Sequence, residues 1–221
     1  MKLAVPHPLT ALLGSSPKLA SDIYAFNFCP ADYVHPTHRE QFGGALVSDE
    51  IWRARRARAA LSAHILKKMG LDKQPCFDLS HPEWPLVLLD ASKLNRLQRH
   101  IMAFVFSPMV RHSIMHQEVI AWKTRLGPDA YKFALNGTTL LPRLELPKAA
   151  LHAARAEELA YGCIEAAMST AVEPLLLRAR LKLPCSRIKP DTDAASAKRL
   201  VYALLSILEP EWRLFFPATR I

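Results

Sequence analysis

Glycine is scarce in this sequence, with 7 glycines among 221 residues against 17 prolines. The glycines form neither the G-x-x-x-x-G-K-[ST] loop that cradles phosphates nor the G-x-G-x-x-G turn of dinucleotide-binding folds. The G-x-S-x-G elbow of serine hydrolases is also missing. We therefore expect no enzyme activity. Scarce glycine and abundant proline favour helices punctuated by proline over strands joined by glycine turns, so the predicted fold is all-α.

A long apolar run is missing as well. The longest one, Ile101 to Val110, is about half of the roughly 20 residues that span a bilayer, and Pro108 interrupts it. Prolines also break the N-terminal stretch where a signal peptide would need an apolar core. We expect no membrane insertion. We expect residues 1–16 to form an irregular N-terminal arm and residues 17–221 a single compact multi-helix domain.

Cysteines are few and widely spread, and no C-x-x-C pair occurs among them: Cys29, Cys76, Cys163 and Cys185. This pattern is typical of cytosolic thiols rather than of a secreted disulfide scaffold. Acidic residues are outnumbered, since the formal net charge is +9 and the pI is near 9.6. An excess of positive charge favours an acidic partner, which can be nucleic acid, a membrane surface or an acidic protein face.

Apolar spacing and capping residues predict the helices. The pattern is clearest from Ser48, a possible N-cap, to Gly70, a typical C′ residue, and no glycine or proline interrupts it. Pro147 is well placed at the first position of an alanine-rich helix that Pro174 should bend or end. The other expected helices are 90–107 capped by Asp90, a central helix of about 110–126 closed by Gly127 and Pro128, a short 128–136 segment, and 191–208.

Two histidines at helical spacing, His112 and His116, raise the question of a zinc-protease helix. Ser113 stands where the glutamate of H-E-x-x-H would be, and Lys123 shares the face of the two histidines. A zinc site there is therefore not expected.

The basic run Arg53 to Arg58 raises the question of a phosphate-binding ridge. In one continuous helix, Arg53 and Arg56 would lie on one side while Arg55 and Arg58 point roughly opposite. A ridge needs a single face, so this geometry favours intramolecular salt bridges or a protein contact.

The stretch CPADYVHPTH, residues 29–38, offers a second possible zinc site. Its ligands would be Cys29, His35 and His38, with Asp32 or Glu40 as the fourth. The spacing C-x5-H-x2-H is not a common structural-zinc pattern. In the alternative interpretation the stretch is architecture: Phe28, Cys29 and Tyr33 pack into the core, and His35 makes a structural hydrogen bond near the first turn.

The same stretch resembles a known family. FNFCPADYVHP is similar to the N-terminal signature of the SctK (YscK-like) family, and the matching residues are Phe28, Cys29, Pro30, Ala31, Tyr33 and His35. A second segment, LGPDAYKFALNG at 126–137, is similar to the middle of these proteins. His38 is not part of the signature, which further weakens the zinc interpretation.

The resemblance implies a non-enzymatic adaptor without a cofactor or small-molecule substrate. In that family the protein belongs to the sorting platform of bacterial type III secretion systems, where it joins the pod protein SctQ to the cytosolic domain of the inner-membrane ring protein SctD. The implied location is cytoplasmic and peripheral to the inner membrane.

One binding surface of such an adaptor is expected to be basic, because cations exceed acids locally at Arg53, Arg56, Lys67 and Lys68. The alternative function is that of a basic helical protein that binds nucleic acid.

Overall fold

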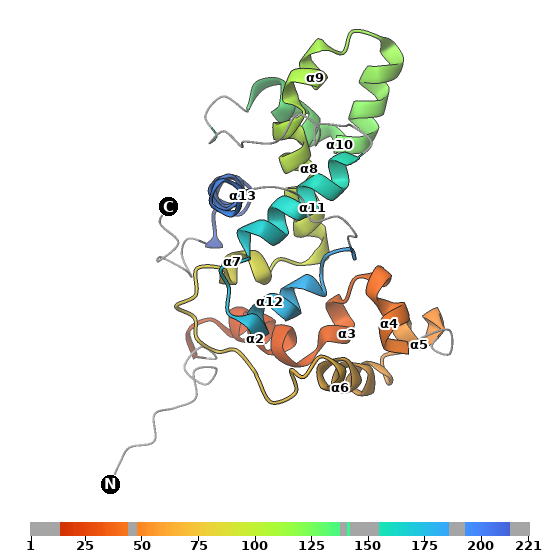
Figure 1. Cartoon of the computed structure of the whole chain (residues 1–221), viewed down its shortest axis with the longest axis vertical. Helices are drawn as coiled ribbons and strands as arrows, with labels where there is room; N and C mark the ends of the chain where they lie inside the picture. Colours follow the sequence, from red (N-terminus) through yellow and green to blue (C-terminus); the bar gives the residue numbers. More distant parts are fainter. Residues whose placement is uncertain (1–13, 44–47, 138–140, 142–154, 186–192, 213–221) are drawn as a thin grey trace. The chain divides into compact units, whose positions relative to one another are not determined.

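The computed structural model describes residues 14–43, 48–137, 141, 155–185 and 193–212. Within these ranges every regular element is a helix, as Figure 1 shows, so the all-α prediction is confirmed. The described residues group into two units. The first takes those of 1–88 and 171–185, and the second those of 89–170 and 186–221. The domain boundaries expected from the sequence stay a prediction, and most of the expected N-terminal arm lies outside the described residues.

The first unit consists mainly of short helices, and several begin with a proline at the first or second position. Proline suits that position because its missing N–H would have no intrahelical partner. The helices are α2 (Pro17–Phe28), α3 (Pro30–Tyr33), η1 (Pro36–His38), α4 (Arg39–Gly43), α5 (Asp49–Arg53), α6 (Arg58–Lys68), α7 (Trp84–Val87) and α12 (Glu173–Arg180). One core cluster joins Ala31, Val34, Phe42, Trp52, Ile65 and Leu181.

The helix predicted from Ser48 to Gly70 is wrong in its middle. The chain forms two helices, α5 and α6, because Ala54 adopts an extended conformation (φ −70°, ψ 114°) and ends α5. Four arginines within residues 53–58 would repel one another at helical spacing. The break separates them and lets Trp52, which is 5% exposed, enter the core.

The end of α6 follows the prediction. Gly70 has φ +68°, the N–H of Leu71 donates to the Leu66 carbonyl (2.8 Å), and that of Gly70 donates to the Lys67 carbonyl (3.1 Å). This pair of bonds is the Schellman motif, which satisfies the last carbonyls of a helix.

Longer helices build the second unit: α8 (Ala91–Val105), α9 (Ser107–His112), α10 (His116–Asn136), α11 (Ala156–Ala167) and α13 (Ala194–Leu208). α8 packs against α10, α11 and α13, and α11 packs against α13. As expected, Asp90 caps α8 by accepting from the Lys93 N–H (2.9 Å), and Leu94, Leu97 and Ile101 are buried. α8 also ends before Pro108, as predicted.

The predicted central helix of about 110–126 is wrong at its start, because residues 113–115 divide it into α9 and α10. Its end at Gly127 and the short segment from Pro128 to Asn136 are confirmed. Gly127 has non-helical angles (φ 76°, ψ 168°), so α10 consists of two helical stretches that meet at a kink there. The position is not central either, since the Ile114 side chain is 91% exposed.

The helix predicted between Pro147 and Pro174 ends earlier than expected, and the one predicted over 191–208 begins later. Pro147 lies outside the described residues, and the described part of that region, α11, ends at Ala167, well before Pro174, which instead lies in the first turn of α12. α13 begins after Asp193, whose carboxylate accepts from the Ser196 N–H (2.8 Å). No helix in the described ranges has both the length and the apolar character needed to cross a membrane.

Candidate functional site

The signature segment forms the junction between α2 and α3. Cys29 ends the first helix, and Pro30 begins the second. The Tyr33 hydroxyl donates to the Phe26 carbonyl (2.7 Å), and the two rings stack with centroids 5.8 Å apart. The Lys182 ammonium lies 5.1 Å from both ring centroids. Cation–π contacts of this kind fasten the connection after α12 to the signature segment.

The other signature residues contribute packing and turn geometry. Pro30 and Ala31 are buried, whereas Phe28 and Cys29 are partly buried at the edge of the core. Phe28 contacts the rings of Tyr24 and Phe77 at 5.0 and 6.2 Å between centroids. Burial raises the pKa of the Tyr33 hydroxyl and also that of the Cys29 thiol, so both stay protonated at neutral pH.

His35 caps η1. Its Nδ1 accepts from the Thr37 N–H (3.3 Å), and its own backbone N–H donates to the Leu181 carbonyl (2.7 Å). The expected hydrogen bond of His35 near the first turn is therefore present. Burial is the main reason that the pKa of His35 is lowered. The backbone N–H of Cys185 donates to the Thr37 hydroxyl (2.8 Å), which ties this turn to a distant part of the sequence.

The zinc arrangement considered for this stretch does not form among the described residues, where no three His, Cys, Asp or Glu side chains gather at metal-binding distance. His38 donates from Nε2 to the Leu183 carbonyl (2.8 Å) and accepts at Nδ1 from Gln41 (2.9 Å). Both ring nitrogens are used, which leaves neither as a ligand.

A buried arginine that sequence reasoning missed lies beside the signature. Arg178 of α12 is 0% exposed and donates to the carbonyls of Leu71 (2.9 Å), Pro174 (3.0 Å) and Asn27 (3.4 Å). Burial lowers its pKa. A buried cation held by carbonyl oxygens joins three chain segments at the signature. In the sequence it looks like any arginine of an amphipathic helix.

Asn27 extends this arrangement. Its amide donates to the Cys76 carbonyl (2.8 Å) and its oxygen accepts from the Cys76 N–H (2.7 Å), and the side chain is 0% exposed. The Asn27 side chain thus bonds both the N–H and the carbonyl of Cys76, as a neighbouring strand would, although Cys76 lies 49 residues away in an irregular segment. Both contacts use hydrogen-bonding capacity that burial would otherwise leave unsatisfied.

The break between α5 and α6 changes how the basic candidates lie. Arg53, Arg55 and Arg56 are exposed around the turn, and none has an ion pair with a described residue. Arg58, by contrast, pairs with Asp32 (3.2 Å). The argument that one helix splits these arginines between two faces no longer applies. We call Arg53, Arg55 and Arg56 the arginine turn.

Lys67 and Lys68 lie at the other end of α6. They lie nine and ten residues beyond Arg58, the first residue of α6, which is about 14 to 15 Å along the helix at a rise of 1.5 Å per residue. Both are exposed, and Lys68 donates to the Gln41 carbonyl. The structure therefore divides the four basic candidates into two places, and lysines at a helix C-terminus have a local role because they complement the helix dipole.

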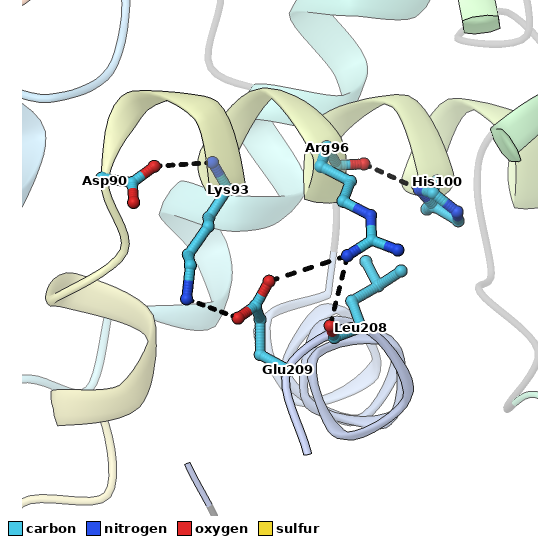
Figure 2. Close-up of polar contacts among 6 residues, drawn as sticks. All are labelled: Asp90, Lys93, Arg96, His100, Leu208 and Glu209. Atoms are coloured by element: carbon cyan, nitrogen blue, oxygen red, sulfur yellow. Dashed lines mark hydrogen bonds and ion pairs between the residues drawn. The ribbon is translucent and has the colours of Figure 1, made fainter. Parts of the chain in front are cut away.

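In the second unit, polar side chains on α8 hold the end of α13 (Figure 2). Glu209 accepts from the Lys93 ammonium (2.6 Å) and lies 3.8 Å from Arg96, whose guanidinium also donates to the Leu208 carbonyl (3.4 Å). His100 donates from Nδ1 to the Arg96 carbonyl (2.8 Å). A cavity of about 270 Å³ beside α8 is lined by Arg96, Arg99, His100 and the Gly127 kink. The ion pair from Lys93 and the hydrogen bond from Arg96 hold the C-terminal end of α13 against α8.

A family model described as YOP proteins translocation protein K (YscK) matches residues 20–209. The chain belongs to this family. YscK-family membership makes it a type III secretion protein, from a family of secretion-apparatus components that is not a known enzyme family. The matched range contains both segments that resembled the family. No curated protein and no solved structure matches the chain.

Proposed function

We propose that this YscK-family chain is a non-enzymatic adaptor of the type III secretion sorting platform, which links the pod protein SctQ to the cytosolic domain of the ring protein SctD. The family match over residues 20–209 carries the proposal. The location that follows is cytoplasmic, at the inner membrane through the secretion apparatus. No cofactor or small-molecule substrate enters this function.

The arginine turn supports a role in binding an acidic protein face. Three exposed guanidinium groups within four residues, none paired with a described carboxylate, are ready to form charge-assisted hydrogen bonds with a partner. In the structure Arg53 and Arg56 belong to this turn, whereas Lys67 and Lys68 are remote from it. We therefore assign the SctD contact to the turn first and treat the lysines as a separate contact.

The test is a binding titration between the purified full chain and the SctD cytosolic domain. The variant Arg53→Glu/Arg56→Glu should weaken binding at least about tenfold at low salt, and the difference should shrink as salt screens the charges. The control is Lys18→Glu/Lys73→Glu, which makes the same charge change at two exposed lysines of the same unit. Equal affinities for both variants across the salt series would contradict the contact.

The arginine turn also favours the alternative function, nucleic-acid binding. The argument against a phosphate-binding surface assumed one continuous helix that places the arginines on opposite faces, and that helix is broken. Binding to a generic DNA duplex separates the two functions. A nucleic-acid-binding protein should show an affinity that falls steeply with salt, since it releases counterions from several phosphates. The adaptor should bind the duplex no more tightly than any protein of charge +9.

A further inference from the structure

Hydrogen bonds tie the connection after α12, residues 181–185, to η1. The His35 N–H donates to the Leu181 carbonyl (2.7 Å), His38 Nε2 to the Leu183 carbonyl (2.8 Å) and the Cys185 N–H to the Thr37 hydroxyl (2.8 Å). We call this set of bonds the η1 latch. Cys185 is the last residue of the first unit, so the latch holds the chain at the point where it leaves that unit.

The place of Thr37 in the latch depends on a neutral His35. The Thr37 hydroxyl accepts from Cys185, so its own hydrogen is free to donate to His35 Nδ1, 2.9 Å away. The Thr37 N–H donates to the same nitrogen (3.3 Å). Two donors therefore converge on one lone pair, which exists only while Nδ1 carries no proton. A proton on Nδ1 would face the Thr37 N–H and leave that group without its acceptor.

The surroundings of His35 decide when that proton arrives. Burial lowers the pKa of His35 below its ordinary value of 6.5, and the neighbouring His38 and Arg39 lower it further. The other charged side chains on the elements around it are Asp32, which pairs with Arg58 (3.2 Å), Glu40, and Lys182, whose ammonium lies over the Phe26 and Tyr33 rings. The His35 ring is therefore neutral at neutral pH, and two cationic neighbours repel a proton that it takes up at lower pH.

His38 tolerates a proton better than His35 does. Its Nε2 keeps the hydrogen that it donates to the Leu183 carbonyl in either protonation state. The partner of its Nδ1, the Gln41 amide (2.9 Å), can turn over to present its oxygen. Protonation therefore leaves the bond of His38 in the latch intact, and His38 acts on His35 through the charge that it adds three residues away.

We propose that the η1 latch is a pH-sensitive switch: protonation of His35 displaces Thr37, the Cys185 N–H loses its acceptor, and the connection after α12 detaches from η1 in mildly acidic solution. The bonds that need a neutral ring are formed at neutral pH and are lost as the pH falls through the lowered pKa of His35, which lies below 6.5. The switch depends on contacts within the first unit alone, and it is independent of the adaptor function.

The test is a pH titration of the isotope-labelled full chain by nuclear magnetic resonance, from about pH 7.5 to about pH 5. The His35 ring and the amides of Thr37 and Cys185 should shift with one midpoint below 6.5. Protection of the Cys185 amide against hydrogen exchange should fall at least about threefold over the same range. In His35→Asn the asparagine oxygen replaces Nδ1 as a cap without titrating, so both amides should keep their neutral-pH positions. His81→Asn, outside the latch, should titrate like the wild type.

A second variant measures the part of His38. His38→Gln keeps a donor for the Leu183 carbonyl but removes a titratable charge, so the midpoint of the His35 ring should rise toward 6.5. Two outcomes would overturn the switch. One needs no variant: the His35 ring titrates in the wild type while the amides of Thr37 and Cys185 do not move. The other is that both amides shift as far in His35→Asn as in the wild type, which would place the titrating group elsewhere.

Discussion

Buried polar side chains have different partners in the two units. In the first unit they reach across the sequence: Arg178 bonds Leu71, Asn27 bonds Cys76, and Ser62 accepts from the Ala31 N–H (3.2 Å). In the second unit Gln98 and His100 bond within their own helix, to Met102 and Arg96. Short helices leave many backbone groups without an intrahelical partner, so distant side chains must satisfy them. Long helices satisfy their own.

The largest effect is expected when the long-range bonds of the first unit are removed. Arg178→Met removes the hydrogen bonds that the buried guanidinium donates to the carbonyls of Leu71, Pro174 and Asn27, and should lower the free energy of unfolding by about 4 kcal/mol. Urea unfolding followed by circular dichroism measures the loss, and hydrogen exchange should place it in α2 and around Leu71. Arg180→Met, an exposed position on the same helix, is the control and should cost at most about 0.5 kcal/mol. Equal losses would mean that the buried bonds add nothing.

A smaller loss of stability is expected from replacing a positive-φ glycine, and it should be equal in the two units because it comes from backbone strain and not from side-chain partners. Gly70 and Gly127 have φ values of +68° and +76°, where a side chain is strained. Each replacement by alanine should cost about 1 kcal/mol, since the Cβ added at Gly127 would meet only the movable end of Arg99 at 3.3 Å. Gly14→Ala, with no contact and no positive φ, is the control. A loss at one glycine only would show that context outweighs backbone strain.

The smallest effect concerns pH. Burial lowers the pKa of His100 below its ordinary value of 6.5, so the unfolded chain takes up the proton first as the pH falls. The contribution of this histidine is complete above 6.5 and declines below that value, down to the folded-state pKa. His100→Gln should therefore lose less stability than the wild type between neutral and mildly acidic pH, as urea midpoints at each pH will show. The pKa of His35 is also lowered, but His35 is present in both the wild type and the His100→Gln variant, so its effect on stability cancels in the comparison. Identical pH slopes would contradict the assignment.

The sequence was informative wherever the signal was local. The Asp90 cap and the spacing of Leu94, Leu97 and Ile101 predicted α8, and Gly70 predicted the end of α6. The break after Arg53 is marked by neither glycine nor proline, and the burial of Trp52 is a tertiary effect. The repulsion among the four arginines was its local indication, but their positions were interpreted as two faces of one continuous helix.

The same reasoning explains which site residues could not be predicted. The signature residues were recognised through a resemblance, but Arg178 bonds residues at least 107 positions away, apart from Pro174. The break between α9 and α10 was hidden as well, because the sequence predicted one central helix in its place, whereas Ile114 and Met115 at the break are exposed.

The four thiols offer unequal access to chemistry. Cys76 and Cys163 are buried, and Cys29 is partly buried with a raised pKa, whereas Cys185 is exposed. Its backbone N–H already contacts Thr37 beside His35. A maleimide dye should therefore label the native protein first at Cys185, without any engineered cysteine. That label becomes an optical reporter placed at the signature segment, able to sense a partner arriving at the first unit.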